Sequence, residues 1–167
     1  MEIKYSLINN EPVFHVVGKG WSTGVVHLFF LVEDDYQTYF NKTTVQPKDF
    51  IRKVKEIGYT INTEIFFNYD SIQARVVDHK RDTIKYFEIH KDIQDMVSAL
   101  YHLRTKDLRD LKEGETITID IFFDGEINNL KLKLMGREQL KSKFGTVNTL
   151  VFKPFVQAGR VFKENES

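Results

Sequence analysis

The sequence predicts a mainly β protein, a large curled antiparallel sheet or half-barrel packed around a single amphipathic helix. Most segments alternate apolar and polar residues, which is the period of a β-strand, and short turns separate them. Only residues 92–105 instead repeat their apolar side chains at helical spacing. Consecutive strands with short turns favour an antiparallel meander over βαβ units. A sheet of roughly eight or more strands tends to twist and curl.

The predicted strands follow one another from the N-terminal region to the C-terminal region. In the segment 57–69, Ile65 and Phe67 share a face with other apolar residues, and Glu64 lies on the opposite face. The dipeptide Asp124-Gly125 is a signal for a type I′ hairpin turn. In chain order, the strands are predicted at residues 12–20, 25–34, 57–69, 71–77, 83–90, 115–123, 129–135 and 147–156.

The predicted helix, "DIQDMVSALYHLRT", begins with Asp92 as its N-cap and carries Asp95 in its first turn. A lone helix can bury its apolar stripe only against the sheet, so we expect it to pack in the concave face as a plug. A second interpretation makes it a lid over an apolar ligand cavity. The residues that would line that cavity are Met96, Leu100, Phe67, Ile119 and Ile121.

Composition bounds the function. The chain has 167 residues, enough for a single domain, and its 24 basic and 24 acidic residues give a formal net charge of zero. A nucleic-acid partner is not expected without a basic excess. The absence of cysteine excludes disulfides and thiolate chemistry. No apolar run is long enough to span a membrane, and the N-terminus lacks the pattern of a signal peptide.

The search for catalytic motifs is negative. The five histidines form no metal-binding pair, and no nucleophile or phosphate-binding motif is present. We therefore predict no catalytic, cofactor-binding or metal-binding residue and no cofactor. An enzyme would gain support only if Asp120, His27 or His90 met in a pocket with shifted pKa values.

Two surface features are candidates for contact with a partner. Trp21 lies in the glycine-rich stretch "GKGWSTG" and could anchor to lipid or sugar, or fold back over a sheet edge. Lys131 and Lys133 share one strand face, and Lys141 and Lys143 alternate in the same way. These lysines could form a basic strip for anionic partners, or a solvated outer face.

Several stretches resemble an uncharacterised family of exported bacterial proteins, domain-of-unknown-function family 3108. They are "VFHVVGKGWSTG", "PKDFIRKVKEIGY", "DIQDMVSALYHLRT", "TIDIFFDGEINNLKLKLMGRE" and "SKFGTVNTLVFKPFVQAGRVFKENES". The resemblance implies a periplasmic or outer-membrane-associated protein of Gram-negative bacteria, more distantly similar to lipoprotein carriers whose curled sheets hold acyl chains. It carries over no functional residue. Because the family usually extends further at both ends, we expect residues 1–167 to be one β-rich domain truncated at one or both ends.

The expected function is that of a non-enzymatic cell-envelope protein that binds a lipid or another amphipathic ligand, with peripheral membrane association as one form of contact. The alternative is a structural or assembly factor that binds an envelope protein or a polysaccharide. The first hypothesis needs an apolar cavity beneath Met96 and Leu100, whereas the second needs an exposed aromatic or basic patch.

Overall fold

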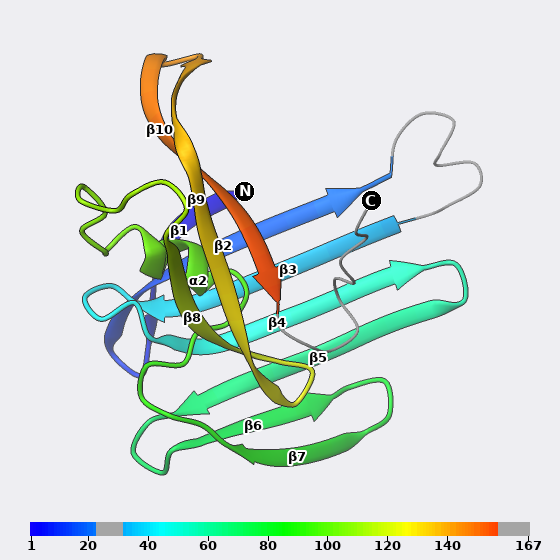
Figure 1. The fold of residues 1–167 in the computed structure, drawn as a ribbon. Coiled ribbons are helices and arrows are strands. Elements are labelled where there is room, and N and C mark those ends of the chain that lie inside the picture. The colour runs from blue at the N-terminus through cyan, green and yellow to red at the C-terminus, as the bar shows by residue number, and fades with distance from the viewer. Residues whose placement is uncertain (23–31, 157–167) are drawn as a thin grey trace.

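The computed structural model describes residues 1–22 and 32–156, which form two antiparallel sheets and one short helix (Figure 1). The mainly β prediction is confirmed, but the strands divide between a seven-stranded and a three-stranded sheet, and neither closes into a barrel. The large sheet holds β1 (Glu2–Ile8), β2 (Glu11–Trp21), β3 (Val32–Asn41), β4 (Pro47–Glu56), β5 (Tyr59–Asn68), β6 (Gln73–Asp78) and β7 (Thr83–Glu88). The small sheet holds β8 (Thr116–Phe123), β9 (Glu126–Ser142) and β10 (Gly145–Val156).

The large sheet is the expected meander, because each strand pairs with the next along the chain. Asn9 and Asn10 join β1 to β2 at φ angles of 50° and 64°, a backbone conformation that asparagine tolerates better than most residues. Neither β1 nor β4 was among the predicted strands. Most of the predicted strand 25–34 lies outside the described residues, and β3 begins at Val32.

The small sheet crosses in front of the large one (Figure 1), and aromatic side chains fill the space between the two layers. Phe122 on β8 is buried, and its ring centroid lies 6.2 Å from that of Phe67 on β5 and 5.5 Å from that of Phe87 on β7. Phe40 and Phe50 belong to the same buried cluster. Burial of a phenylalanine side chain stabilises a fold by about 1.5–3 kcal/mol, so this cluster is a main contact between the layers.

The helix is shorter than the predicted 92–105. Helix α2 spans Ser98–Leu103, and Gln94, within the expected first turn, instead forms an isolated parallel bridge with Ile121 of β8. The Gln94 N–H donates to the Asp120 carbonyl over 2.9 Å, and the Phe122 N–H donates to the Gln94 carbonyl over 2.8 Å. Strand-like pairing of this segment therefore replaces the first turns of the expected helix.

A buried carboxylate fixes the start of α2. One oxygen of Asp95 accepts hydrogen bonds from the N–H groups of Val97 and Ser98 at 2.7 and 2.8 Å. The other oxygen accepts from the Thr38 hydroxyl on β3 at 2.5 Å. Asp92 was expected to accept hydrogen bonds from the N–H groups at the start of the helix but is exposed, and the fully buried Asp95 accepts them instead. It also ties the helix to the centre of the large sheet.

Helix α2 contacts a second apolar cluster that belongs to the small sheet. Ala99 is buried there with Ile119, Ile121 and Leu132. On the other side, Tyr101 packs on Phe40 of the large sheet with ring centroids 5.0 Å apart. The helix therefore packs against both sheets, as the plug interpretation expected.

A β-bulge divides the long hairpin formed by β9 and β10. Phe152 pairs with Leu134, but Val151 pairs with Gly136, so Met135 is an extra residue on β9. Because side chains alternate along a strand, one extra residue reverses which face each later residue occupies. Before the bulge, Leu132 and Leu134 face the core; beyond it, Leu150 and Val151 are half-buried, and every side chain from Arg137 through Asn148 is exposed.

Candidate functional site

A cleft of about 190 Å³ lies between the large sheet and the turn that joins β8 to β9. Apolar side chains form most of its wall, and charged and hydroxyl groups surround them. The lining residues are Phe50, Arg52, Thr63, Ile65, Val76, Asp78, Arg81, Thr83, Lys85, Phe87, Phe123, Asp124 and Gly125. They come from four neighbouring strands, β4 to β7, from the turn between β6 and β7, and from the end of β8 with the turn that follows it, so the site exists only once both sheets have packed together.

Arg52 connects the two sides of this cleft. Its Nη1 donates to the Asp124 carboxylate over 2.6 Å, and its guanidinium carbon lies 4.5 Å from the centre of the Phe123 ring. The Arg52 side chain is only 14% exposed, and its Nε is buried without a hydrogen-bond partner. A buried guanidinium with an unused N–H can donate to one further anionic or carbonyl oxygen.

Strand alternation places Arg52 in the cleft. Phe50, Arg52 and Val54 occupy every second position of β4 and share the face that the small sheet covers. Across β5, Arg52 pairs with Thr63, and Phe50 pairs with Ile65. The polar pair thus lies one step further along the strands than the apolar pair, and the cleft is apolar at one end and polar at the other.

The roof of the cleft is the tight turn at Asp124 and Gly125. Both residues have positive φ angles, 53° and 81°, as the predicted type I′ turn requires. A Cβ placed on Gly125 would lie 2.9 Å from the ring of Phe87, closer than side chains normally approach. Glycine is therefore needed here both for the backbone conformation and for direct contact between the turn and β7.

The rim of the cleft carries an excess of positive charge. The lining includes Arg52, Arg81 and Lys85 but only two carboxylates, Asp78 and Asp124. Burial raises the pKa of Asp78, but hydrogen bonds from the Arg81 and Lys80 N–H groups and the Arg81 side chain lower it on balance. Asp78 thus stays ionised and paired with Arg81 at 3.0 Å.

The five residues predicted to line a cavity under the helix are not brought together. Met96 and Leu100 are 36% and 48% exposed, on the outside of the α2 region. Phe67 is buried in the aromatic cluster between the sheets, and Ile119 and Ile121 are buried in the cluster around Ala99. The lining role of these residues remains a prediction, and the exposure of Met96 and Leu100 does not favour it.

The predicted basic strip is interrupted. Lys131 and Lys133 share the outward face of β9 with Lys153 of β10, which pairs with Lys133. The bulge at Met135 moves Lys141 to the opposite face, and Lys143 lies in the turn between β9 and β10. The four predicted lysines therefore do not form one surface. The sequence did not show this separation, because a β-bulge leaves no clear mark in the alternation of apolar and polar residues.

Other candidate groups lie away from the cleft. Trp21 is 67% exposed and borders an open hollow of about 580 Å³ near the ends of β2 to β5. His90 and Asp120 do meet, with the His90 Nε2 3.1 Å from an oxygen of the Asp120 carboxylate and both side chains partly exposed, and Asn129 donates to the same carboxylate. His27 lies outside the described residues. The His90–Asp120 pair is not among the residues that line the cleft.

Arg52, Asp124 and Phe87 were not identified from the sequence. The hairpin signal at Asp124-Gly125 was recognised, but nothing local indicates that this turn packs on β7. In residues 1–22 and 32–156, no group of three or more His, Asp or Glu side chains is arranged to hold a metal ion. Over the same residues, no helix is long and apolar enough to cross a membrane.

Comparison with known proteins identifies a family and no individual relative. The family described as "Protein of unknown function (DUF3108)" matches residues 1–167. The chain therefore belongs to the DUF3108 family, as the resemblance of its motifs implied. A search of the curated proteins and a search of the solved structures each find no match to the chain.

Proposed function

We propose that this DUF3108 protein is a non-enzymatic binding module of the cell envelope, and that it holds an amphipathic anion in the cleft beneath the β8–β9 turn. The observation that carries the proposal is Arg52, a largely buried cation with an unpartnered Nε, set beside the apolar side chains of Phe50 and Phe123. An apolar wall with one well-placed charge is typical of sites for small amphipathic molecules.

The size of the cleft limits the ligand. About 190 Å³ is below the roughly 300–1,000 Å³ of pockets that enclose drug-sized molecules. The cleft fits an anionic head group and the first part of an apolar tail, whether the ligand is a fatty acid or the end of a larger lipid. We expect the anionic oxygens to meet Arg52 and the tail to follow Ile65, Val76 and Phe87.

The envelope location rests on the exported bacterial proteins that the sequence resembles. A binding role without catalysis fits the composition of the cleft, where Arg52, Arg81 and Lys85 provide cations and no histidine or cysteine lines the wall. The lining carboxylates Asp78 and Asp124 pair with Arg81 and Arg52. The pairing of both carboxylates with arginines supports a role of this cleft in holding an anion.

Native mass spectrometry of protein made in a Gram-negative periplasm tests the proposal. We expect a bound species of defined mass that organic solvent removes, and we expect Arg52→Gln to reduce its occupancy. Lys55→Gln, on the same strand but paired with Glu33 away from the cleft, is the matched control and should leave occupancy unchanged.

An NMR titration tests the same site in vitro. Decanoate should shift the amide signals of Arg52, Phe87 and Gly125, whereas the cation decylammonium should not. A bare polypeptide mass together with no response to decanoate would refute the proposal. Thermal unfolding of Arg52→Gln, followed by circular dichroism, establishes whether this variant is folded at the temperature of the measurements.

A further inference from the structure

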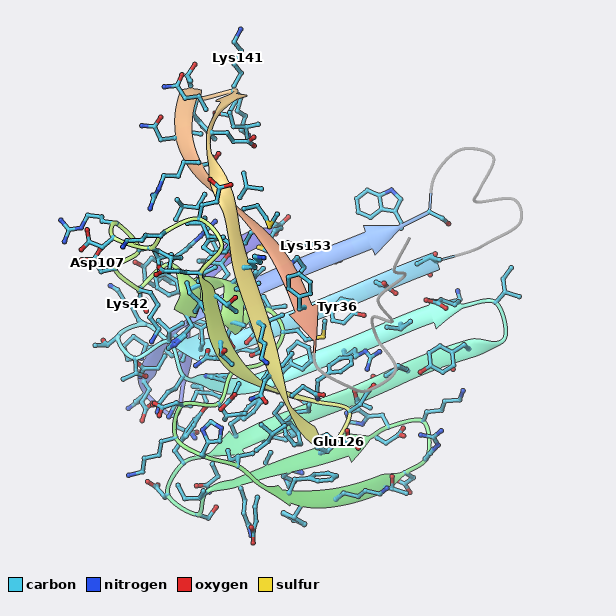
Figure 2. All side chains as sticks on the ribbon, viewed as in Figure 1. Tyr36, Lys42, Asp107, Glu126, Lys141 and Lys153 are labelled. Carbon is cyan, nitrogen blue, oxygen red and sulfur yellow. The ribbon has the colours of Figure 1, made fainter. Side chains whose placement is uncertain are left out.

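The far half of the β9–β10 hairpin projects beyond both sheets (Figure 1). Every side chain from Arg137 through Asn148 is exposed, although the two strands stay paired up to Ser142 and Gly145. Figure 2 shows Lys141 at the end of the hairpin, while Glu126 lies at the opposite end of β9. An isolated two-stranded hairpin is at best marginally stable in water, so a projecting one has little contact to hold it in place.

Apolar side chains are concentrated at the end of this projection. Phe144, in the turn, is 84% exposed, the largest value among the exposed large hydrophobic residues of the described chain. Leu140 and Val147 face each other across the two strands and are also exposed. Exposed apolar clusters of this kind mark sites of contact with a protein or a membrane.

The charges near Phe144 are all positive. Residues 139–149 contain Lys141 and Lys143 and no acidic residue. Lys143 places its Nζ 5.0 Å from the centre of the Phe144 ring. The adjacent cation at the base, Arg137, points instead to the loop before β8, where its Nη2 donates to three backbone carbonyls, those of Leu108, Arg109 and Leu111. Arg137 therefore holds the base of the hairpin, and the two lysines carry the charge at its end.

We propose that this hairpin docks on an anionic lipid surface. Phe144 enters the interface between head groups and acyl chains with Leu140 and Val147 behind it, while Lys141 and Lys143 contact phosphate groups. A projecting apolar end with two lysines, and with no carboxylate among residues 139–149, matches a negatively charged membrane. A protein groove would more often be met with specific polar contacts. The proposal does not depend on the cleft, which lies at the other end of β9.

Vesicle co-sedimentation tests the proposal with the whole chain. Wild-type protein should bind phosphatidylcholine vesicles that contain about one third phosphatidylglycerol and should not bind pure phosphatidylcholine. The double variant Lys141→Gln/Lys143→Gln should bind about 30-fold more weakly, since each lysine near an anionic surface contributes about a factor of five. Phe144→Ser should weaken binding about tenfold.

Matched controls are available on other surfaces. Lys106→Gln/Lys112→Gln removes two exposed lysines from the loop before β8, and Ile84→Ser removes an exposed apolar side chain from β7. Both controls should bind vesicles like the wild type. All of these variants should retain decanoate binding, so failure of the docking proposal is distinguishable from failure of the proposed ligand site.

Three results would overturn the docking proposal. The wild type could ignore anionic vesicles, or the hairpin variants could bind as well as the controls. Binding could also be lost in Trp21→Ser but retained in Phe144→Ser, which would place the membrane contact at the end of β2 instead. A photo-crosslinker at position 144 that captures one envelope protein, with no vesicle binding, would favour the assembly-factor alternative.

Discussion

Replacement of Asp95 by alanine should destabilise the protein by an amount that depends strongly on pH. Asp95 is fully buried, and its carboxylate accepts hydrogen bonds from Thr38, Val97 and Ser98. Burial raises its pKa to about 6, although these hydrogen bonds act in the opposite direction. The carboxylate therefore organises the start of α2, but at a cost in desolvation when it is ionised.

The hydrogen bonds to Asp95 stabilise the fold, whereas desolvation of its charge destabilises it, and a change of pH separates the two contributions. The pKa of Asp95 is about 6 in the folded protein and 3.8 in the unfolded chain. The contribution of Asp95 to the free energy of unfolding is therefore fully present below pH 4 and is lost as the pH rises through 6. A shift of about two units corresponds to about 3 kcal/mol. In Asp95→Ala, two N–H groups and one hydroxyl lose their acceptor, which costs about 3–6 kcal/mol in total near pH 4. Near pH 7 the cost should be about 3 kcal/mol smaller.

Urea unfolding measured between about pH 4 and pH 7 provides the assay. Far-UV circular dichroism is the suitable signal, because the sole tryptophan, Trp21, is 67% exposed and reports little on the core. Burial and the neighbouring Glu64 raise the pKa of Asp49 to about 7, and the charge of Asp95 adds to this rise. Removal of Asp95 therefore lowers the pKa of Asp49 as well, which acts in the same direction as the predicted difference between pH 4 and pH 7. Asp92→Ala should change stability by less than about 0.5 kcal/mol. An equal loss for Asp95→Ala at both pH values would refute the reasoning.

Three other changes give separate tests. Gly125→Ala should cost about 1–3 kcal/mol in chemical unfolding and weaken decanoate binding by calorimetry, because its Cβ meets Phe87; unchanged affinity would contradict the role of the turn as a roof. Phe122→Ala should cost about 3–5 kcal/mol in the same unfolding assay, and a loss below about 1 kcal/mol would show that the two sheets do not depend on this ring. Arg137→Met should speed trypsin cleavage after Lys106 or Arg109, while an unchanged rate would show that its three carbonyl contacts do not hold the loop.

The strands and their inner faces were largely predictable from the sequence. Alternation in β5 and β8 correctly placed Ile65, Phe67, Ile119 and Ile121 on buried faces. The same rule failed for Tyr59, which shares a strand face with Ile65 but is exposed. Alternation identifies the face of a strand and does not show how far the covering layer extends along it.

The length of the helix could not be predicted from its apolar spacing. Ile93 and Val97 are buried as a helical stripe would bury them, yet the backbone at Gln94 pairs with β8. Tertiary pairing overrode local propensity here, and a local pattern contains no information about a partner strand more than twenty residues away.

The candidate site could not be predicted from the sequence, because Arg52 and Asp124 are distant in sequence and meet only when the two sheets pack together. In the stretch "PKDFIRKVKE", alternation separates Arg52, which shares a face with Phe50 and Val54, from Lys53 and Lys55, but it does not show which face another layer covers. Only burial does so, since Arg52 is covered while Lys55 is exposed. Burial of a charge depends on the opposing layer and therefore on the complete fold.

The extra residue at Met135 has a consequence for how this protein can change over time. β10 has no extra residue, and directly opposed residues share a face, so loss of Met135 would leave the pairing of β9 with β10 unchanged and keep Lys141, Leu140 and Val147 on their present faces. Leu132 and Leu134, on the core side of the bulge, would keep their places. The bulge thus gives β9 one position at which a residue can be lost without a change in the surface that the rest of the hairpin presents.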